Sequence, residues 1–270
     1  MSNAVFYHSN CYDGFGAAYA AWKKFGDENT TYHPVSYGFP APEVEADNLY
    51  IVDFSYKKGE LLDLLGRHKS VIVLDHHKTA QEELEPLIDV YPNLEIIFDM
   101  NRSGAKIAWE YFHSSESGSV SYNQLIEHIS DRDLWRFELE NSKTIHKALV
   151  SYPMNFELWD SFKIENLVRE GLTCERLYGQ LVENICKHSF ELVIDGHKVP
   201  AVNTSIAWSE VGAYLLEKHP EAPFVASFTV FDNQTMWSLR SKGEFDVSAV
   251  AKKFGGGGHK NAAGFKTAKF

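Results

Sequence analysis

The chain has 270 residues, of which 44% are hydrophobic, and a formal net charge of −11 at pH 7. That length can bury a sizeable core in one large domain or in two smaller ones. An acidic chain is a poor binder of long polyanions, because contacts to a nucleic-acid backbone need clustered Lys and Arg. No segment is long and apolar enough to span a bilayer, and the first residues lack the features of a secretory signal. We therefore expect a cytoplasmic protein that binds neither membranes nor long duplex DNA.

Residues 1–110 alternate between predicted strands and predicted helices. Four segments are typical of strands, at 4–8, 48–54, 70–76 and 94–100, and the last three are apolar runs of the kind found in strands buried on both faces. Helical character is found at 14–25, 57–67 and 103–113. This alternation predicts an α/β fold, in which a parallel sheet carries helices on both of its faces.

The second half of the chain has a different pattern. Amphipathic helices are predicted at 119–132 and 163–189. Turn signals at Asp195-Gly196 and Asp232-Asn233 each lie between two apolar runs, and they predict two hairpins separated by a short helix near 209–218. We expect an N-terminal catalytic domain at 1–160, a helical connector at 161–189 and a smaller mixed α/β domain at 190–270.

Acids and histidines follow several predicted strands at the point where each strand ends. In an open parallel sheet, ligands bind outside the carboxyl ends of the strands. Residues at these ends, in the loop after the first strand and at the end of a predicted helix are therefore candidates for metal binding or catalysis. They are His8, Asp13, Asp53, Asp75, His76, His77 and Asp131.

The mixture of histidine and aspartate predicts a particular class of metal. These ligands suit Mn²⁺, Fe²⁺ or Zn²⁺ better than Mg²⁺ or Ca²⁺, which favour oxygen ligands. Two such ions about 3.5–4 Å apart can clamp a phosphate and activate a water, and a carboxylate between them is needed to hold them that close. A single Asp at a strand end is usually a turn former or a helix cap. The adjacent pair His76-His77 is harder to explain structurally.

Three further features have two interpretations each. The glycine run at 255–258, followed by His259, resembles a flexible linker, but small residues also let backbone N–H groups approach an anion. Arg240 ends a predicted strand and can bind a phosphate in a bidentate manner, or it is a solvated surface residue. Cys11 lies near the predicted site and is interpreted as a small loop residue rather than a nucleophile.

These motifs together resemble those of the DHH phosphoesterase superfamily. VLDHHKTA contains the Asp-His-His signature, and GGGGHKNAAGF is similar to the glycine-rich histidine motif of the associated C-terminal domain. YHSNCYDGFGAA, IVDFS and ISDRDLW look like the first, second and fourth motifs. The resemblance covers nearly the whole chain. It implies a bilobal fold with the active site in the cleft between the domains.

The resemblance also implies two divalent metal ions, usually Mn²⁺. By motif match, His8 and Asp13 would bind one ion and Asp53 would bridge both. His76 and Asp131 would bind the second ion.

Other positions would orient ligands or contact the substrate. Asp75 would orient His76, and His77 would face the substrate phosphate. The residues that the resemblance implies in substrate binding are Ser103, Gly104, Arg240, Gly256, Gly257, Gly258 and His259.

The first motif departs from the resemblance in two respects. Members of the superfamily often carry two acids separated by one residue, whereas no acid follows Asp13 at that spacing. The distance along the chain from the motif's histidine to Asp13 is also one residue longer. Either Asn10 or Asp133 replaces the missing acid, or the second metal is held weakly.

The expected function is that of a manganese-dependent phosphodiesterase that hydrolyses short oligonucleotides or dinucleotides by two-metal activation of water. The alternatives are a phosphatase, polyphosphatase or pyrophosphatase of the same superfamily, or a catalytically weakened nucleotide-binding protein. A dinucleotide-dependent oxidoreductase is disfavoured, because DGFGAAYA lacks the G-x-G-x-x-G pattern. The expected partner is a short nucleotide or phosphate ester, and a homodimer is compatible with the sequence.

Overall fold

The chain forms two compact units, Met1–Glu175 and Arg176–Phe270, in a computed structural model that describes residues 1–115 and 123–268. The units divide within helix α8 (Ile164–Cys186), inside the predicted connector at 161–189. Each unit has its own sheet and its own hydrophobic core. Among the described residues, no helix combines the length and the apolar character that a membrane span requires.

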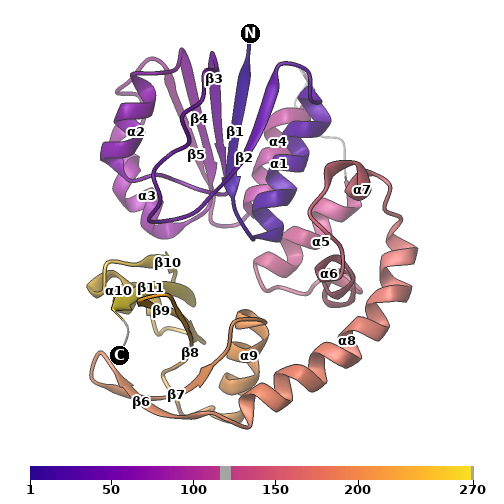
Figure 1. Ribbon diagram of the computed structural model, residues 1–270, viewed down its shortest axis with the longest axis vertical. Coiled ribbons are helices and arrows are strands. Elements are labelled where there is room, and N and C mark those ends of the chain that lie inside the picture. The colour runs from indigo at the N-terminus through magenta and orange to yellow at the C-terminus, as the bar shows by residue number, and fades with distance from the viewer. Residues whose placement is uncertain (116–122, 269–270) are drawn as a thin grey trace. The chain divides into compact units, whose positions relative to one another are not determined.

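The first unit is built on a five-stranded sheet in which every neighbouring pair is parallel, in the order β2-β1-β3-β4-β5 (Figure 1). The strands are β1 (Asn3–His8), β2 (Thr30–Val35), β3 (Asn48–Val52), β4 (Ser70–Asp75) and β5 (Leu94–Phe98). Four of them were predicted from the sequence. The edge strand β2 was missed, because it contains Pro34 and exposed positions in place of a continuous apolar run.

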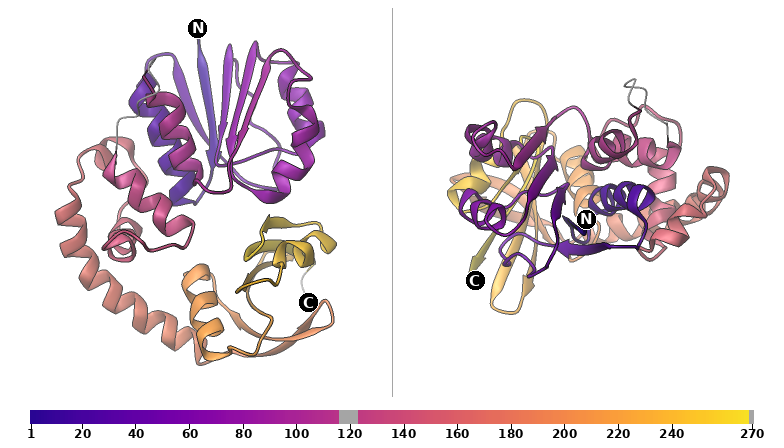
Figure 2. Two further views of the ribbon diagram at one scale, coloured as in Figure 1. Left: turned by 180° about the vertical axis from the view of Figure 1, so that it is seen from behind. Right: turned by 90° about the horizontal axis from the view of Figure 1, so that it is seen from above.

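Helices cover both faces of this sheet, as predicted, with α1 and α4 on one face and α2 and α3 on the other (Figure 1; Figure 2, left). The helices of the unit, besides the first part of α8, are α1 (Tyr12–Phe25), α2 (Lys58–Leu65), α3 (Lys78–Leu84), α4 (Gly104–His113), α5 (Gln124–Asp133), α6 (Ser142–Val150) and α7 (Phe156–Asp160). A short 3-10 turn, η1 (Glu85–Leu87), follows α3. Positions 119–122 of the helix predicted at 119–132 lie outside the described residues.

Strand β4 shows why the predicted strands are apolar at every position. Val71 and Val73 belong to the core cluster that includes α2, whereas Ile72 and Leu74 belong to the cluster that includes α1 and α4. Because successive side chains of a strand point to opposite faces, a sheet covered on both sides needs apolar residues throughout. All four are buried, with exposed fractions of 5% or less.

The second unit contains a six-stranded mixed sheet in the order β10-β11-β9-β8-β7-β6. Its strands are β6 (Phe190–Ile194), β7 (His197–Asn203), β8 (Phe224–Phe231), β9 (Gln234–Ser241), β10 (Gly257–His259) and β11 (Ala262–Ala268), with helices α9 (Trp208–Lys218) and α10 (Val247–Lys253). Asp195 and Gly196 have φ values of 50° and 80° and connect β6 to β7 in the predicted hairpin. The mixed α/β architecture of this region was predicted.

The two leucines Leu167 and Leu172 on α8 provide a matched test of the first unit's core. Leu167 is 1% exposed and belongs to the cluster around α1, whereas Leu172 is 52% exposed. We expect Leu167→Ala to lower the free energy of unfolding by about 2–5 kcal/mol, because it leaves a cavity. Leu172→Ala should change it by less than about 1 kcal/mol. Urea unfolding followed by circular dichroism measures both, and equal losses would contradict this assignment of the core.

Candidate metal centre

Polar residues lie at the carboxyl ends of three neighbouring strands of the first sheet, β1, β3 and β4. The parallel register pairs Tyr7 of β1 with Val52 of β3, and Val52 with Leu74 of β4. The residue after each of these positions therefore lies at the carboxyl end of its strand, on the same side of the sheet. Those residues are His8, Asp53 and Asp75, and His76 and His77 follow Asp75 directly.

Asp53 follows β3, the middle one of these three strands, and has an unusual backbone conformation. Its φ is +52°, in the left-handed region that non-glycine residues seldom occupy, and its side chain is 1% exposed. The Asp53 amide donates to the carbonyl oxygen of Leu74 across the sheet at 2.9 Å. Such conformations are found where the surrounding structure fixes a side chain for a task. Here the conformation directs the carboxylate between two groups of possible ligands.

The first group of ligands contains Asp13, Asp53 and His76, whose ligand atoms all lie within 4.8 Å of one another. His76 Nε2 is 3.1 Å from Asp53 Oδ1 and 3.5 Å from Asp13 Oδ2. The Asp133 carboxylate is also near, with Oδ2 at 3.6 Å from the same nitrogen. Burial by itself would lower the pKa of His76, but the carboxylates of Asp53, Asp133 and Asp13 raise it to about 10.

The carboxylates of this group repel one another. Burial, together with Asp133 and Asp53, raises the pKa of Asp13 well above its usual value. Asp53 differs, because His76 and His8 outweigh the effect of burial and lower its pKa well below the usual value. A buried cluster of acids around one imidazole is an environment that a divalent cation would stabilise.

The second group of ligands contains His8, Cys11 and Asp53, again within 4.8 Å of one another. His8 Nδ1 and Asp53 Oδ2 are 3.6 Å apart, which is too long for a hydrogen bond. Both atoms are buried, and neither has a hydrogen-bond partner among the described residues. Buried polar atoms normally find a partner, so the donor set fits a cation held between them. Asp53 thus presents one oxygen to each group.

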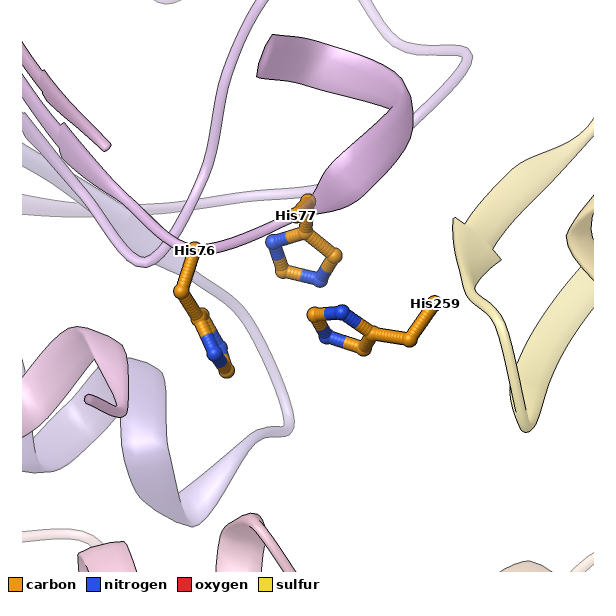
Figure 3. Close-up of side chains that lie close together, drawn as sticks. All are labelled: His76, His77 and His259. Atoms are coloured by element: carbon orange, nitrogen blue, oxygen red, sulfur yellow. The ribbon is translucent and has the colours of Figure 1, made fainter. Parts of the chain in front are cut away.

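Asp75 positions His77, and this differs from the prediction that it orients His76. Asp75 Oδ1 accepts from His77 Nδ1 at 2.7 Å, and Asp75 Oδ2 accepts from the hydroxyl of Ser55 at 2.6 Å. His76 donates its backbone N–H to Asp75 Oδ1 at 2.8 Å, and its ring Nε2 lies near Asp53 and Asp13. Figure 3 shows the two imidazoles leaving the chain in succession between β4 and α3. Although burial opposes it, Asp75 raises the pKa of His77.

The structure places Asp133, and not Asp131, beside His76. The Asp131 carboxylate accepts from the backbone amides of Glu138 and Leu139 at 2.8 Å and 3.1 Å, so it closes the loop that follows α5. In a helix, residues two positions apart do not share a face. The prediction of Asp131 as a ligand is therefore not supported by this geometry. Asp133, which the sequence offered beside Asn10 as a replacement for the missing acid of the first motif, has a carboxylate oxygen 3.6 Å from His76 Nε2.

Ser103 and Gly104 lie at the N-terminus of α4, next to the predicted ligands. Ser103 caps the helix by accepting from Lys106 N at 3.3 Å. Asp13 accepts from the amides of Gly104 at 2.6 Å and Ala105 at 3.1 Å. In this structure Gly104 and its neighbour Ala105 hold the Asp13 carboxylate, and Ser103 caps the helix that carries them.

Arg240 and the glycine motif belong to the second unit. The Arg240 guanidinium donates to the hydroxyls of Ser238 and Ser209 at 2.9 Å and 3.0 Å, so its position on β9 is fixed by α9. A Cβ at Gly212 of α9 would lie 2.5 Å from Arg240 Cγ, which shows how closely the helix approaches this side chain.

The glycine run packs against β11 and is not a linker. Gly257, Gly258 and His259 form β10 and pair with residues of β11. A Cβ at Gly256 would lie 2.1 Å from the carbonyl oxygen of Gly264, and Gly258 has a φ of +138°. The small residues are therefore required for close contact between backbones. Whether His259 and these glycines bind substrate stays a prediction.

Comparison with known proteins gives relatives for both parts of the chain. The family model of the DHHA1 domain matches residues 195–269. An uncharacterised protein of Acanthamoeba polyphaga mimivirus is 30% identical over 97% of this chain and 66% of that protein. Cyclic-di-AMP phosphodiesterase PdeA of Listeria monocytogenes is 26% identical over 89% of this chain but 37% of that protein. Oligoribonuclease NrnB of Bacillus subtilis is 23% identical over 96% and 71%. The chain therefore spans only part of each of these relatives.

Solved structures share the fold. The DHH domain of a member of a family of ribosomal proteins matches 99% of this chain and 83% of its own, with a TM-score of 0.56 and 13% identity. RecJ of Thermus thermophilus, solved in complex with Mn²⁺, matches 98% of this chain and 49% of its own, with a TM-score of 0.53 and 14% identity. At these identities, the likeness shows the α/β architecture alone.

Gly104 allows a test of how closely α4 supports the centre. A Cβ at this position would lie 2.4 Å from Asp53 Cβ and 2.7 Å from Asp53 Oδ1. We expect Gly104→Ala to displace the carboxylate and to weaken Mn²⁺ binding by about 10–100-fold, as changes to ligand-supporting residues do. Isothermal titration calorimetry measures the affinity. Gly59→Ala is the matched control, since a Cβ there meets nothing within 4 Å, and equal effects of the two substitutions would contradict this role.

The raised pKa of His76 predicts that protons leave when metal binds. In the metal-free protein this pKa is about 10, so His76 is imidazolium at neutral pH, whereas only neutral imidazole binds a metal. We expect the apparent Mn²⁺ affinity to rise by about tenfold per pH unit above neutrality, and to level off as the pH reaches the pKa of His76. Calorimetry in buffers of different ionisation enthalpy counts the protons, with a chelator as calibration. Binding enthalpies that are independent of the buffer would refute this prediction.

Proposed function

We propose that this chain, which belongs to the DHH superfamily of phosphoesterases, is a metal-dependent phosphodiesterase that hydrolyses short oligonucleotides or dinucleotides. One observation carries the proposal: the buried Asp53 carboxylate directs Oδ1 to His76 at 3.1 Å and Oδ2 toward His8 at 3.6 Å. A carboxylate between two groups of ligands is the arrangement that a pair of metal ions requires.

Manganese is the proposed metal, with two ions per chain. The ligands are imidazole and carboxylate, which suit Mn²⁺-class ions, and RecJ of similar fold was solved with Mn²⁺. Bound there, the ions would supply Lewis-acid chemistry, by activating a water and offsetting negative charge on the phosphoryl group. The proposed ligands are His8, Asp13, Asp53, His76 and Asp133.

His77 is the proposed contact to the phosphoryl oxygens. Because its Nδ1 donates to Asp75 at 2.7 Å, the tautomer and the orientation of the ring are fixed. Asp75 also raises the pKa of His77, which favours the imidazolium form, in which Nε2 is a donor as well. A fixed donor of this kind stabilises the charge that develops as the phosphorus–oxygen bond breaks.

The net charge of the chain and the names of two relatives favour short substrates. The net charge of −11 gives no basic track for a long strand. Two relatives are named as enzymes of short nucleotides, a cyclic-di-AMP phosphodiesterase and an oligoribonuclease. We propose that Arg240, which two serine hydroxyls hold in place, binds a terminal phosphate of the substrate together with His259 and the glycines of β10.

A substrate panel with Mn²⁺ tests the function. It contains short RNA and DNA, cyclic and linear dinucleotides, 3′-phosphoadenosine phosphate, pyrophosphate and polyphosphate. We expect the highest kcat/KM for dinucleotides or short oligonucleotides. Faster cleavage of pyrophosphate or polyphosphate would replace the proposal by the pyrophosphatase or polyphosphatase alternative, and nucleotide binding without turnover would make the chain a binding protein.

Asp53→Asn is the variant that tests the site, because it preserves shape and removes the charge. We expect it to lower Mn²⁺ affinity and turnover by roughly 100-fold or more, since residues that merely orient a ligand already cost about 10–100-fold. Asp63→Asn, at an exposed position of α2, is the control and should match the unaltered chain.

A further inference from the structure

We infer that Cys11 is a metal ligand, and that its sulfur completes the group formed by His8 and Asp53. This inference rests on the proposed metal centre and specifies the donor atoms of one half of it. One ion would then have a thiolate, an imidazole and a carboxylate oxygen, whereas the other would have only nitrogen and oxygen donors.

The position of Cys11 is set by the fold. It is the N-cap residue of α1, in extended conformation with φ −121° and ψ 129°, and its carbonyl oxygen accepts from Phe15 N at 2.9 Å. The helix begins close to the end of β1, because Gly14 has no Cβ: one added there would lie 2.4 Å from the carbonyl oxygen of His8. This close approach brings the cysteine to the sheet edge where His8 and Asp53 lie.

The distances fit a shared ion. The ligand atoms of Cys11, His8 and Asp53 lie within 4.8 Å of one another. Two ligands that each bind a zinc ion at about 2.0–2.3 Å lie at most roughly 4.6 Å apart. Only a small adjustment is therefore needed for all three atoms to meet one ion.

An independent observation supports a ligand here: two of these atoms are buried and make no hydrogen bond within the described residues. Asp53 Oδ2 belongs to a side chain that is 1% exposed, and it has no hydrogen-bond partner among the described residues. His8 Nδ1, which faces it at 3.6 Å, is unpaired in the same sense. A cation between them, with the Cys11 sulfur as third donor, satisfies both buried atoms.

A thiolate at this position changes which metal the group prefers. Thiolate is a soft ligand that selects zinc and related ions, whereas carboxylate suits harder ions such as Mn²⁺. As the sulfur bonds to the ion, the thiol proton leaves to solvent. The two halves of the centre therefore differ in preference: relative to Mn²⁺, the half that contains Cys11 binds Zn²⁺, Co²⁺ or Fe²⁺ more tightly than the other half does.

Cobalt spectroscopy on the full chain tests the inference without reference to activity. The protein is stripped with a chelator, loaded with Co²⁺ and analysed for bound metal, and its near-ultraviolet absorption is recorded. A bound thiolate gives a sulfur-to-cobalt charge-transfer band. We expect the band in the unaltered chain and in Cys174→Ser, the matched control at another half-buried cysteine, and its loss in Cys11→Ser.

A competition experiment provides the second measurement. We expect Cys11→Asp to shift the ratio of Zn²⁺ to Mn²⁺ affinities by about tenfold or more toward Mn²⁺, because a hard donor replaces a soft one. Stoichiometric Co²⁺ without the band, or a band that survives Cys11→Ser, overturns the inference and leaves the proposed metal centre intact. Failure of the unaltered chain to bind Co²⁺ or Mn²⁺ overturns both. Circular dichroism verifies that each variant is folded.

Discussion

The repulsion among buried carboxylates is the constraint on which the rest of this structure depends. Asp13, Asp53 and Asp133 all face the imidazole of His76 at one edge of the first sheet. Removing such charges from water is costly, and bringing them together adds to that cost. In the metal-free protein a proton on His76 offsets part of the repulsion. A proton and a metal ion would therefore compete for the same place in the proposed centre, and the acids that repel one another there would bind a cation most strongly.

The scaffold tolerates this cost because backbone groups hold the acids. Asp13 accepts from two amides at the start of α4, where unpaired N–H groups and the helix dipole favour negative charge. Gly14 and Gly104 let α1 and α4 approach the sheet edge closely. These contacts join α1 and α4 to each other and to the carboxyl ends of β1 and β3, so the candidate centre depends on the packing of the first unit.

The histidines of the Asp-His-His motif divide the chemistry between them. His76 faces carboxylates and can bind a metal, whereas His77 is fixed by Asp75 and can donate to a substrate. The two side chains are adjacent in sequence but have different acid partners, and these partners give them different tasks. In the proposed centre, Cys11 would have a similar effect. Its sulfur would make one half of the centre prefer softer metal ions than the half formed by Asp13 and His76.

The sequence by itself determined the α/β fold of the first unit, the hairpins of the second and the edge of the sheet where His8, Asp53 and His76 meet. Apolar runs that end in acids or histidines identify parallel strands and their carboxyl ends, which is local information. Only the tertiary structure placed Asp133, and not Asp131, beside His76, because these residues are more than fifty positions from the histidine in the chain.

Sequence could not predict the other side-chain contacts of the candidate centre either. That Gly104 adjoins Asp53 and that Asp13 lies beside His76 follow from contacts between elements far apart in the chain. Periodicity shows which face of a strand or helix a residue occupies, but it carries no information about which distant side chain it meets there. Sequence thus located the candidate centre, whereas packing between segments distant in the chain brought its possible donors together.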